Sequence, residues 1–488
     1  MNAAFGCDLT ACASALPHVW EHTVGSDHAL MALRADWQAQ LKRAHQELGF
    51  RHVRFHGILD DDVGTLLCEQ DRLVYAFFNS DQIFDFLLSI GMKPFVELSF
   101  MPSTLSSGAT TVFKYRGNVT PPKDYAQWAT LIGKLVRHWV DRYGLAEVRQ
   151  WYFEVWNEPN LKAFWTAEQA DYFKLYRYTV EAIKAIDSQL KVGGPATAEN
   201  AWVSEFLDYC ADQSVPADFV STHHYPTDAF GQPGDDTETQ LSGSRRSVLR
   251  DQARVTYERA RGKPVVYTEW CTSSNPFDPL HDEPYAAAFV TKTNMEAVGL
   301  VEGYSWWTFS DLFEENYLSS LPFHGGFGLL NIHGIAKPAY RAYQLLHRLG
   351  FEQLPVSGSH ATVDVWVVRG DDQITVLAVN SALPRHPIAS ETVRVSLTRA
   401  ARPTAVSIAR IDAGNANVKR NWLAMGAPDY LSASQVQLLD AASELQYREQ
   451  PWNFANGVIE LVLTLPAQAV AAVTLEFARD EAPNSTQA

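Results

Sequence analysis

The strongest constraint on the fold is a rhythm that runs from about residue 28 to residue 347. Short runs rich in β-branched and aromatic residues alternate there with longer stretches in which apolar residues recur at helical spacing. This alternation is typical of repeated βα units, which form a parallel sheet covered by helices. Because the chain has 488 residues and a (β/α)8 barrel typically takes roughly 250, we expect an α/β TIM barrel over residues 22–347 and a second domain.

Seven of the eight barrel strands can be placed on the sequence. They are expected at residues 52–56, 94–99, 151–156, 192–195, 219–224, 265–268 and 303–308. The first strand should lie between Val24 and Leu33, although Gly25 and Asp27 leave its limits open.

Two helices have clear amphipathic patterns. One is expected over residues 124–143, with Gly144 at its C-terminal cap. The other is expected to begin at Thr166 with Gln169 as its capping-box partner. Both are candidates for the outer ring of barrel helices.

The rhythm changes beyond about Leu354 to short alternating strands. They are expected at residues 361–368, 373–379, 393–397 and 458–463. This pattern predicts an accessory β-sandwich over residues 348–480, to which the N-terminal segment 1–21 is assigned. A polar tail, 481–488, should be frayed. No low-complexity linker separates the two domains, so we expect them to pack together.

Charge and cysteine usage exclude several function classes. The net charge of −16, without a Lys/Arg-rich stripe, opposes nucleic-acid and membrane partners. No apolar run approaches the ~20 residues that span a bilayer, and no basic stretch opens a signal peptide. The five cysteines are scattered and lack CxxC spacing, which predicts neither disulfides nor a zinc site. We expect a cytoplasmic protein, or a periplasmic one if an export signal has been removed.

Two glutamates stand where buried strands end. Pro159 forces the chain out of the ladder just after Asn157 and Glu158, and Glu269 follows the apolar run 264–268 directly. On the strand count these acids end the fourth and seventh strands. The carboxyl ends of the strands carry the active face of such barrels, so the two side chains should face one bond.

Four stretches carry a resemblance to a known family. They are FEVWNEP, YTEW, SWWTFSDLFEE and FHGGFGLLN. Together they resemble glycoside hydrolase family 39, whose best-known members are β-xylosidases, and the resemblance runs through nearly the whole chain. The Asn-Glu pair is shared by a large clan of barrel glycosidases, whereas the last two stretches are much narrower.

The resemblance assigns roles to residues around the barrel mouth. It implies that Glu158 is the catalytic acid/base and Glu269 the nucleophile, and that Asn157 hydrogen-bonds the sugar 2-hydroxyl. His223 and Tyr225 match an active-site His-x-Tyr, in which the phenol orients the nucleophile.

Further sugar contacts follow from the same resemblance. His56 matches a sugar-binding histidine, Trp307 a stacking platform, and Glu314 and Glu315 two polar contacts after the eighth strand. His224 reads as a neighbour of the site rather than a ligand. No metal or other cofactor is expected.

The implied reaction is a double displacement. An anionic Glu269 about 5–5.5 Å away keeps Glu158 protonated until it donates to the leaving oxygen, and esterification of Glu269 then turns Glu158 into a base. The resemblance implies that the substrates are xylo-oligosaccharides. The family match, together with long loops after the third and eighth strands at residues 100–115 and 313–327, favours cutting at their non-reducing ends.

Three alternatives stay open at this point. An α-L-arabinosidase would use nearly the same hydroxyl arrangement, whereas an α-L-iduronidase-like enzyme must bind an anionic sugar, which Glu314 and Glu315 disfavour. A non-catalytic sugar-binding barrel is disfavoured by the intact acids. Three tryptophans of the second domain are assigned to its core rather than to a sugar-binding stripe: Trp366, Trp422 and Trp452. Sequence leaves the oligomeric state unknown.

Overall fold

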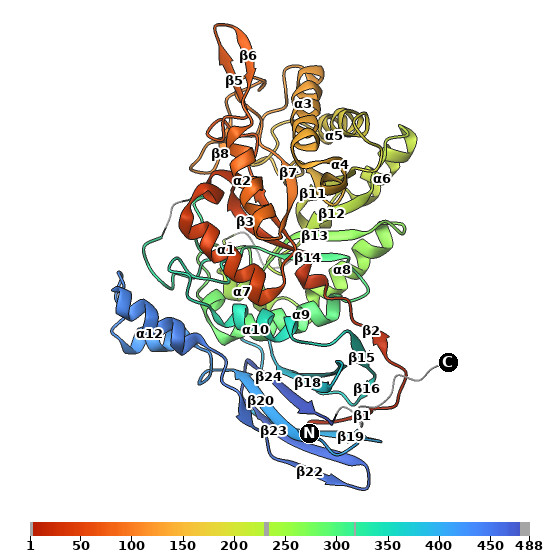
Figure 1. Ribbon diagram of the computed structural model, residues 1–488, viewed down its shortest axis with the longest axis vertical. Coiled ribbons are helices and arrows are strands. Elements are labelled where there is room, and N and C mark those ends of the chain that lie inside the picture. Colours follow the sequence, from red (N-terminus) through yellow and green to blue (C-terminus); the bar gives the residue numbers. More distant parts are fainter. Residues whose placement is uncertain (1–2, 229–233, 317–318, 479–488) are drawn as a thin grey trace.

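The structure is a computed structural model that describes residues 3–228, 234–316 and 319–478. A closed barrel ringed by helices occupies one end of the molecule, and two further sheets pack beneath it (Figure 1). The predicted fold, a (β/α)8 barrel with a β-sandwich, is confirmed. The predicted tail, 481–488, lies outside the described residues.

Eight parallel strands close the barrel. In chain order they are β3 (Thr23–His28), β4 (His52–His56), β7 (Lys93–Leu98), β10 (Tyr152–Val155), β11 (Lys191–Thr197), β12 (Phe219–His223), β13 (Val265–Trp270) and β14 (Gly303–Trp306). Closure occurs where Trp306 of β14 pairs with Val24 of β3.

Two strand limits differ from the prediction in an informative way. The first strand begins at Thr23 and stops at His28, because the following Ala29–Leu33 form a 3-10 helix, η2. Strand β13 runs on through Glu269 to Trp270, since Glu269 pairs with His223 in the ladder. Glu269 is therefore held by the sheet itself rather than by a loop.

Helices cover the outside of the barrel. They are α1 (Ala35–Leu48), α2 (Phe78–Ser89), α3 (Tyr125–Tyr143), α4 (Leu145–Val148), α5 (Gln169–Lys184), α6 (Val203–Asp212), α7 (Thr237–Ser242), α8 (Val248–Arg259), α9 (Pro284–Ala297) and α10 (Pro338–His347), with 3-10 turns η1 (Val19–Glu21), η3 (Ala198–Asn200) and η4 (Pro279–Asp282). None of these described helices is long and apolar enough to cross a membrane.

The two helices predicted from pattern fared differently. Helix α3 has Asp124 as its N-cap, whose carboxylate accepts from the Ala126 N–H, and it ends before Gly144 as expected. The predicted start of α5 at Thr166 is wrong. The N-cap is Glu168, which forms a capping box with Asp171. Thr166 cannot take this position because its N–H donates to the carbonyl of Val119 in a barrel loop.

The two remaining large sheets face each other as a sandwich. One holds β1 (Ala3–Asp8), β16 (Val356–Ser357), β19 (Glu391–Thr398), β22 (Trp452–Ala455) and β23 (Val458–Leu465); the other holds β2 (Ser14–Ala15), β15 (Glu352–Leu354), β17 (Val363–Arg369), β18 (Gln373–Asn380), β20 (Ala405–Ile411), β21 (Arg448–Glu449) and β24 (Ala469–Glu476). Strand β1 pairs with β19, so the N-terminal segment contributes a strand to this domain. Buried Val and Leu side chains from both sheets fill the space between them.

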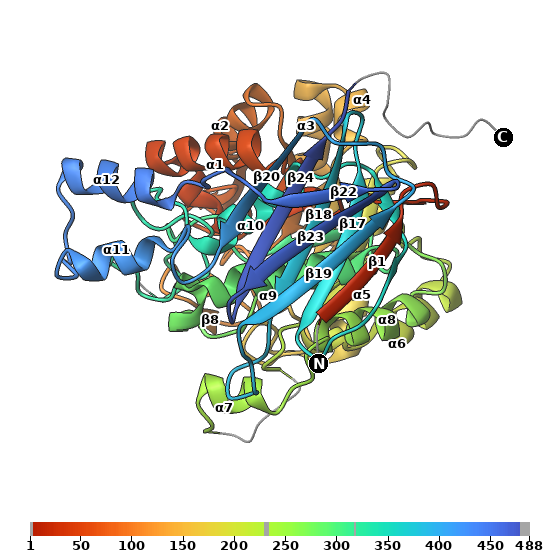
Figure 2. The ribbon, with the colours of Figure 1, turned by 90° about the horizontal axis from the view of Figure 1, so that it is seen from below.

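A helical hairpin leaves the sandwich between β20 and β21. Its helices are α11 (Val418–Ala424) and α12 (Ala433–Ser443), which project beside the barrel (Figure 2). Trp422 is buried there against Phe323 of a barrel loop. Of the other two tryptophans assigned to the core, Trp366 packs partly buried against the barrel core and Trp452 partly buried against the sandwich core.

Short hairpins decorate the loops at the barrel mouth. They are β5 (Leu66–Glu69) with β6 (Arg72–Tyr75), and β8 (Thr111–Val112) with β9 (Gly117–Asn118). The second hairpin meets the long loop after β14, where the Lys114 N–H donates to the Glu315 carbonyl at 2.7 Å. The two long loops flagged in the sequence are thus joined across the mouth.

Candidate active site

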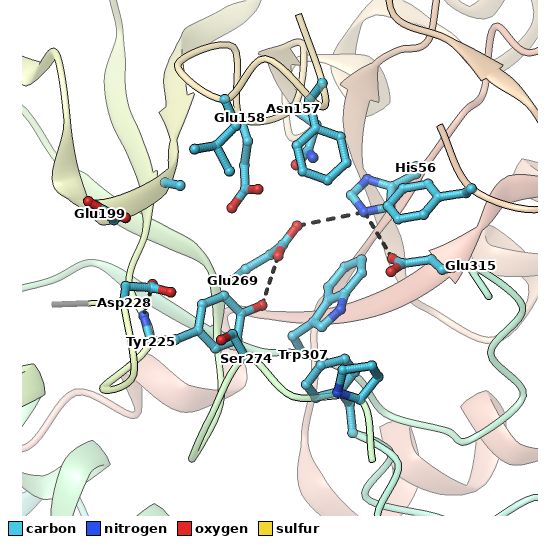
Figure 3. A pocket seen from close by; sticks show the side chains of 16 residues that line it. His56, Asn157, Glu158, Glu199, Tyr225, Asp228, Glu269, Ser274, Trp307 and Glu315 are labelled. Atoms are coloured by element: carbon cyan, nitrogen blue, oxygen red, sulfur yellow. Dashed lines mark hydrogen bonds and ion pairs between the residues drawn. The ribbon is translucent and has the colours of Figure 1, made fainter. Parts of the chain in front are cut away.

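A cavity of about 220 Å³ opens at the carboxyl ends of the barrel strands (Figure 3). Seven of the nine residues predicted to form the site line it: His56, Asn157, Glu158, Tyr225, Glu269, Trp307 and Glu315. The other lining residues are Phe113, Leu161, Phe164, Ala198, Glu199, Asp228, Ser274, Pro276 and Phe327. His223 lies behind this wall, and Glu314 points elsewhere.

The backbone turns sharply to present Glu158. Strand β10 ends at Val155, and both Trp156 (φ 74°) and Glu158 (φ 44°) then adopt left-handed conformations. Such conformations cost of order 1–3 kcal/mol each and persist only where surrounding contacts hold them. The Glu158 N–H donates to the Ala196 carbonyl at 2.8 Å, and the Trp156 indole donates to the Phe164 carbonyl at 2.8 Å.

Glu269 is held by donors on both carboxylate oxygens. The Tyr225 hydroxyl donates to Oε2 at 2.8 Å, as the family resemblance implied, and Arg54 Nη1 donates to Oε1 at 2.7 Å. These contacts fix the carboxylate plane in a side chain that is 5% exposed. Figure 3 shows this carboxylate pointing toward Glu158 across the cavity.

The surroundings of Glu158 favour its protonated form. Burial raises its pKa to about 7, and the nearby cations His56 and Arg54 only partly oppose the shift. Its Oε1 lies 2.9 Å from Nδ1 of His223. Burial lowers the pKa of His223 to about 4, so this imidazole is neutral near pH 7. A carboxyl with such a pKa can both donate and accept a proton at neutral pH.

The closeness of the two carboxyls is compatible with one of the two glycosidase mechanisms. One carboxylate oxygen of Glu158 and one of Glu269 lie within 4.8 Å of each other. Retaining glycosidases place these groups about 5–5.5 Å apart, whereas inverting ones need roughly 6.5–9.5 Å to admit a water. The spacing therefore suits direct attack by Glu269 on the sugar.

Arg54 contacts four side chains of the site, and the sequence prediction missed it. Its guanidinium contacts Glu154 Oε2 at 2.6 Å and Glu97 Oε2 at 2.6 Å, besides Glu269. Nη2 also donates to Asn157 Oδ1 at 2.9 Å, which leaves the Asn157 amide nitrogen as the group available to a sugar hydroxyl. A signal existed in the sequence, because a charged residue within an apolar strand must be paired when buried.

His56 and Trp307 form one wall of the cavity. His56 Nδ1 lies 2.7 Å from Glu97 Oε2, and its Nε2 lies 3.6 Å from Glu315 Oε1 and 3.8 Å from Glu269 Oε1. Burial opposes the charged ring, but Glu97 and Glu315 outweigh it and raise the pKa of His56 well above its usual value. The Trp307 ring, 4.8 Å from His56, presents its face to the cavity.

Glu314 faces a second cluster instead of the cavity. Its Oε1 lies 3.4 Å from Nδ1 of His28, whose Nε2 is 3.4 Å from both Asp60 and Asp62. Burial disfavours the His28 cation, but these carboxylates raise its pKa to about 12. His28, Asp60 and Asp62 lie close enough to surround a cation, but a protonated imidazole has no lone pair with which to bind one.

Glu199 and Asp228 are acids of the wall that sequence reasoning did not find. Asp228 accepts from the Tyr225 N–H at 2.7 Å, and burial raises its pKa to about 8. Both residues lie on the side of the cavity opposite to His56 (Figure 3). They come from loops after β11 and β12, and no pattern in those loops marks them.

Comparisons with known proteins agree with this geometry. The model of glycosyl hydrolases family 39 matches residues 9–457. A β-xylosidase of Caldicellulosiruptor saccharolyticus is 48% identical over 94% of this chain and 95% of its own. A β-xylosidase of Geobacillus stearothermophilus is 37% identical over 95% and 93%. The crystal structure of a monomeric β-xylosidase from Caulobacter crescentus CB15 superposes with a TM-score of 0.85 at 35% identity, covering 97% of this chain and 99% of that one.

Proposed function

This chain belongs to glycosyl hydrolase family 39, and we propose from that premise that it is an exo-acting β-D-xylosidase in which Glu158 is the acid/base and Glu269 the nucleophile. The assignment to retaining glycoside hydrolases follows from the family. The observation that carries the residue roles is the pair of carboxyls within 4.8 Å in one cavity.

The first displacement uses both acids together. Glu269 attacks the anomeric carbon while Glu158 transfers its proton to the departing glycosidic oxygen, so no free alkoxide forms. Asn157, oriented by Arg54, donates its amide N–H to the 2-hydroxyl, a contact that strengthens in the oxocarbenium-like transition state. The products are an alcohol and a glycosyl ester of Glu269.

The second displacement reverses the proton transfer. Once Glu269 is esterified its charge is gone, which removes a repulsion that favoured the neutral form of Glu158. Glu158 then accepts a proton from water as the water oxygen attacks the anomeric carbon and Glu269 leaves as a carboxylate. Two inversions give net retention.

The size and lining of the cavity favour the binding of one neutral sugar at the end of a chain. Its 220 Å³ is about seven times the ~30 Å³ of one water in the liquid, which is the scale of one sugar ring. The hydrogen bond between Lys114 and Glu315 joins two loops beside the cavity. The described lining residues include no Lys or Arg, and the one cationic ring, His56, is already held by Glu97 and Glu315. This disfavours a uronate such as iduronate.

Release of xylose from xylobiose and 4-nitrophenyl β-D-xyloside tests the proposal. Proton NMR should show β-xylose as the first anomer, and Glu269→Ala should abolish the signal. Early α-xylose would exclude retention. Faster turnover of α-L-arabinosides or α-L-iduronides would keep the mechanism and replace the substrate, and sugar binding without turnover would favour a non-catalytic barrel.

Xylo-oligosaccharides and a cytoplasmic location complete the proposal. The supports are the β-xylosidase relatives and five cysteines that are all unpaired, as expected in a reducing compartment. Production of the labelled chain in its host, followed by fractionation, would test the location.

A further inference from the structure

His223 occupies a position between the acid/base and the strand that carries the nucleophile. Its ring is fully buried. Nδ1 lies 2.9 Å from Glu158 Oε1, and Nε2 lies 3.0 Å from the hydroxyl of Thr268. Each ring nitrogen has one hydrogen-bond partner, and Nδ1 also lies 3.6 Å from Glu269 Oε2. The partner of Nε2 decides which nitrogen carries the proton.

The hydroxyl of Thr268 has only one hydrogen to give. It donates that hydrogen to Glu154 Oε1 at 2.7 Å. The other oxygen of Glu154 accepts from Arg54 Nε at 2.6 Å, so this carboxylate is ion-paired and acts as an acceptor only. Thr268 must consequently accept from His223, which places the imidazole hydrogen on Nε2.

That tautomer leaves a lone pair on Nδ1 facing Glu158. An ionised Glu158 would set two lone pairs against each other at 2.9 Å. A neutral Glu158 instead donates its hydrogen to Nδ1. The contact thus favours the protonated acid, in the same direction as burial.

From this geometry we propose that Thr268 is a positioning residue which, by fixing the tautomer of His223, keeps Glu158 protonated between turnovers. The inference deepens the proposed function and rests on it. In the first displacement the proton passes from Glu158 to the glycosidic oxygen. In the second, the same unfavourable lone-pair contact makes the Glu158 carboxylate a stronger base toward water.

Other charges act on the same two groups and stay in place when Thr268 is changed. Those around Glu158 are the cations His56 and Arg54, the acids Glu97, Glu199, Asp228, Glu269 and Glu315, and the phenol of Tyr225. Those around His223 are Arg54, Glu97, Glu154 and Glu269. A change confined to the Thr268 hydroxyl leaves these charges in place and removes its hydrogen bonds to His223 and Glu154, and Glu154 keeps its ion pair with Arg54.

Thr268→Val tests the proposal because valine has the same shape but no hydroxyl. Without the acceptor at Nε2, His223 can move its hydrogen to Nδ1 and donate to the Glu158 carboxylate. We expect the basic limb of the pH profile of kcat/KM to move down by about one pH unit. The loss should be larger for xylobiose, which needs acid assistance, than for 2,4-dinitrophenyl β-D-xyloside. Thr268→Ser, which restores the hydroxyl, should return the limb to the wild-type position.

A readout without substrate separates this inference from the proposed function. In selectively labelled wild type at pH 6, the ¹⁵N shifts of His223, assigned by their absence in His223→Gln, should show hydrogen on Nε2 alone. Hydrogen on Nδ1, or on both nitrogens, would overturn the proposal even if the enzyme is a β-xylosidase. An unshifted basic limb in a folded Thr268→Val, as judged by thermal unfolding, would also overturn it.

Discussion

The interior of the barrel has two layers that lie one pleat apart on the same strands. The lower layer is a cluster of Phe95, Tyr152, Phe219 and Val266, in which the Phe95 and Tyr152 rings stack at 5.1 Å. Two residues further along three of these strands stand Glu97, Glu154 and Thr268, which belong to the network around Arg54 and His223. Side chains two residues apart on a strand share a face, so both layers point inward.

The difference between the layers is one of directionality. Dispersion and apolar burial in the lower layer tolerate small shifts of each ring, because these forces have no preferred angle. The upper layer buries several charges that are each matched by hydrogen bonds of fixed geometry. Loss of one partner leaves the other as an unpaired buried charge. We expect changes below to affect stability and changes above to affect chemistry.

The largest effect should come from the nucleophile. Glu269→Ala should lower kcat on 4-nitrophenyl β-D-xyloside by about 10⁴-fold or more, because no covalent intermediate can form. Azide should partly restore turnover by entering the vacated space and yielding the inverted, α-configured xylosyl azide, which NMR identifies. A β-configured azide would assign Glu269 another role.

Glu158→Gln should have a smaller and substrate-dependent effect. Loss of the general acid should slow xylobiose hydrolysis by about 10²–10⁴-fold and 2,4-dinitrophenyl xyloside glycosylation far less, since that leaving group needs no proton. The kcat/KM values on the two substrates check this, because they report the glycosylation step and leave out the later hydrolysis of the glycosyl-enzyme. Equal losses on both would mean that Glu158 acts otherwise than as an acid.

The lower layer should behave in the opposite way. Phe95→Ala removes a ring that is 1% exposed and should reduce the free energy of unfolding by about 3–5 kcal/mol. The kcat/KM of the folded enzyme should change little. Denaturant unfolding and active-site-titrated kinetics measure the two, with Phe95→Leu as the milder control. A large loss of kcat/KM in folded enzyme would erase the distinction between the layers.

The smallest effect concerns the pH dependence of stability. Burial raises the pKa of Glu158 from its ordinary value of 4.5 to about 7, so the folded state binds the proton more tightly than the unfolded chain. The contribution of Glu158 to the stability of the folded state is full below pH 4.5 and is lost as the pH rises through about 7. Between pH 5 and pH 8 the free energy of unfolding of the wild type should therefore fall by about 2–3 kcal/mol more than that of Glu158→Gln. If urea unfolding gave the same change in the free energy of unfolding for the two proteins between these pH values, the prediction would be wrong.

Some local features depend on contacts that a sequence pattern does not contain. Helix α5 begins at Gln169 rather than Thr166 because a loop carbonyl, that of Val119, captures the Thr166 N–H. Glu314 and Glu315 are adjacent in sequence and identical in type, yet only Glu315 lines the cavity. His28 takes the other acid because β3 and the loop after β14 meet there.

Local sequence pattern predicts the barrel, the places of seven of its strands and the two catalytic candidates. Apolar periodicity depends on local spacing, and a strand's end is marked by the residues that stop it, so Glu158 beside Pro159 was readable. Which charges meet depends on the assembled fold, because Arg54, Glu154 and Glu269 come from three strands that closure of the barrel brings together. The protonation of Glu158 depends on that closure, since burial and hydrogen-bond partners are properties of the assembled barrel rather than of any one strand.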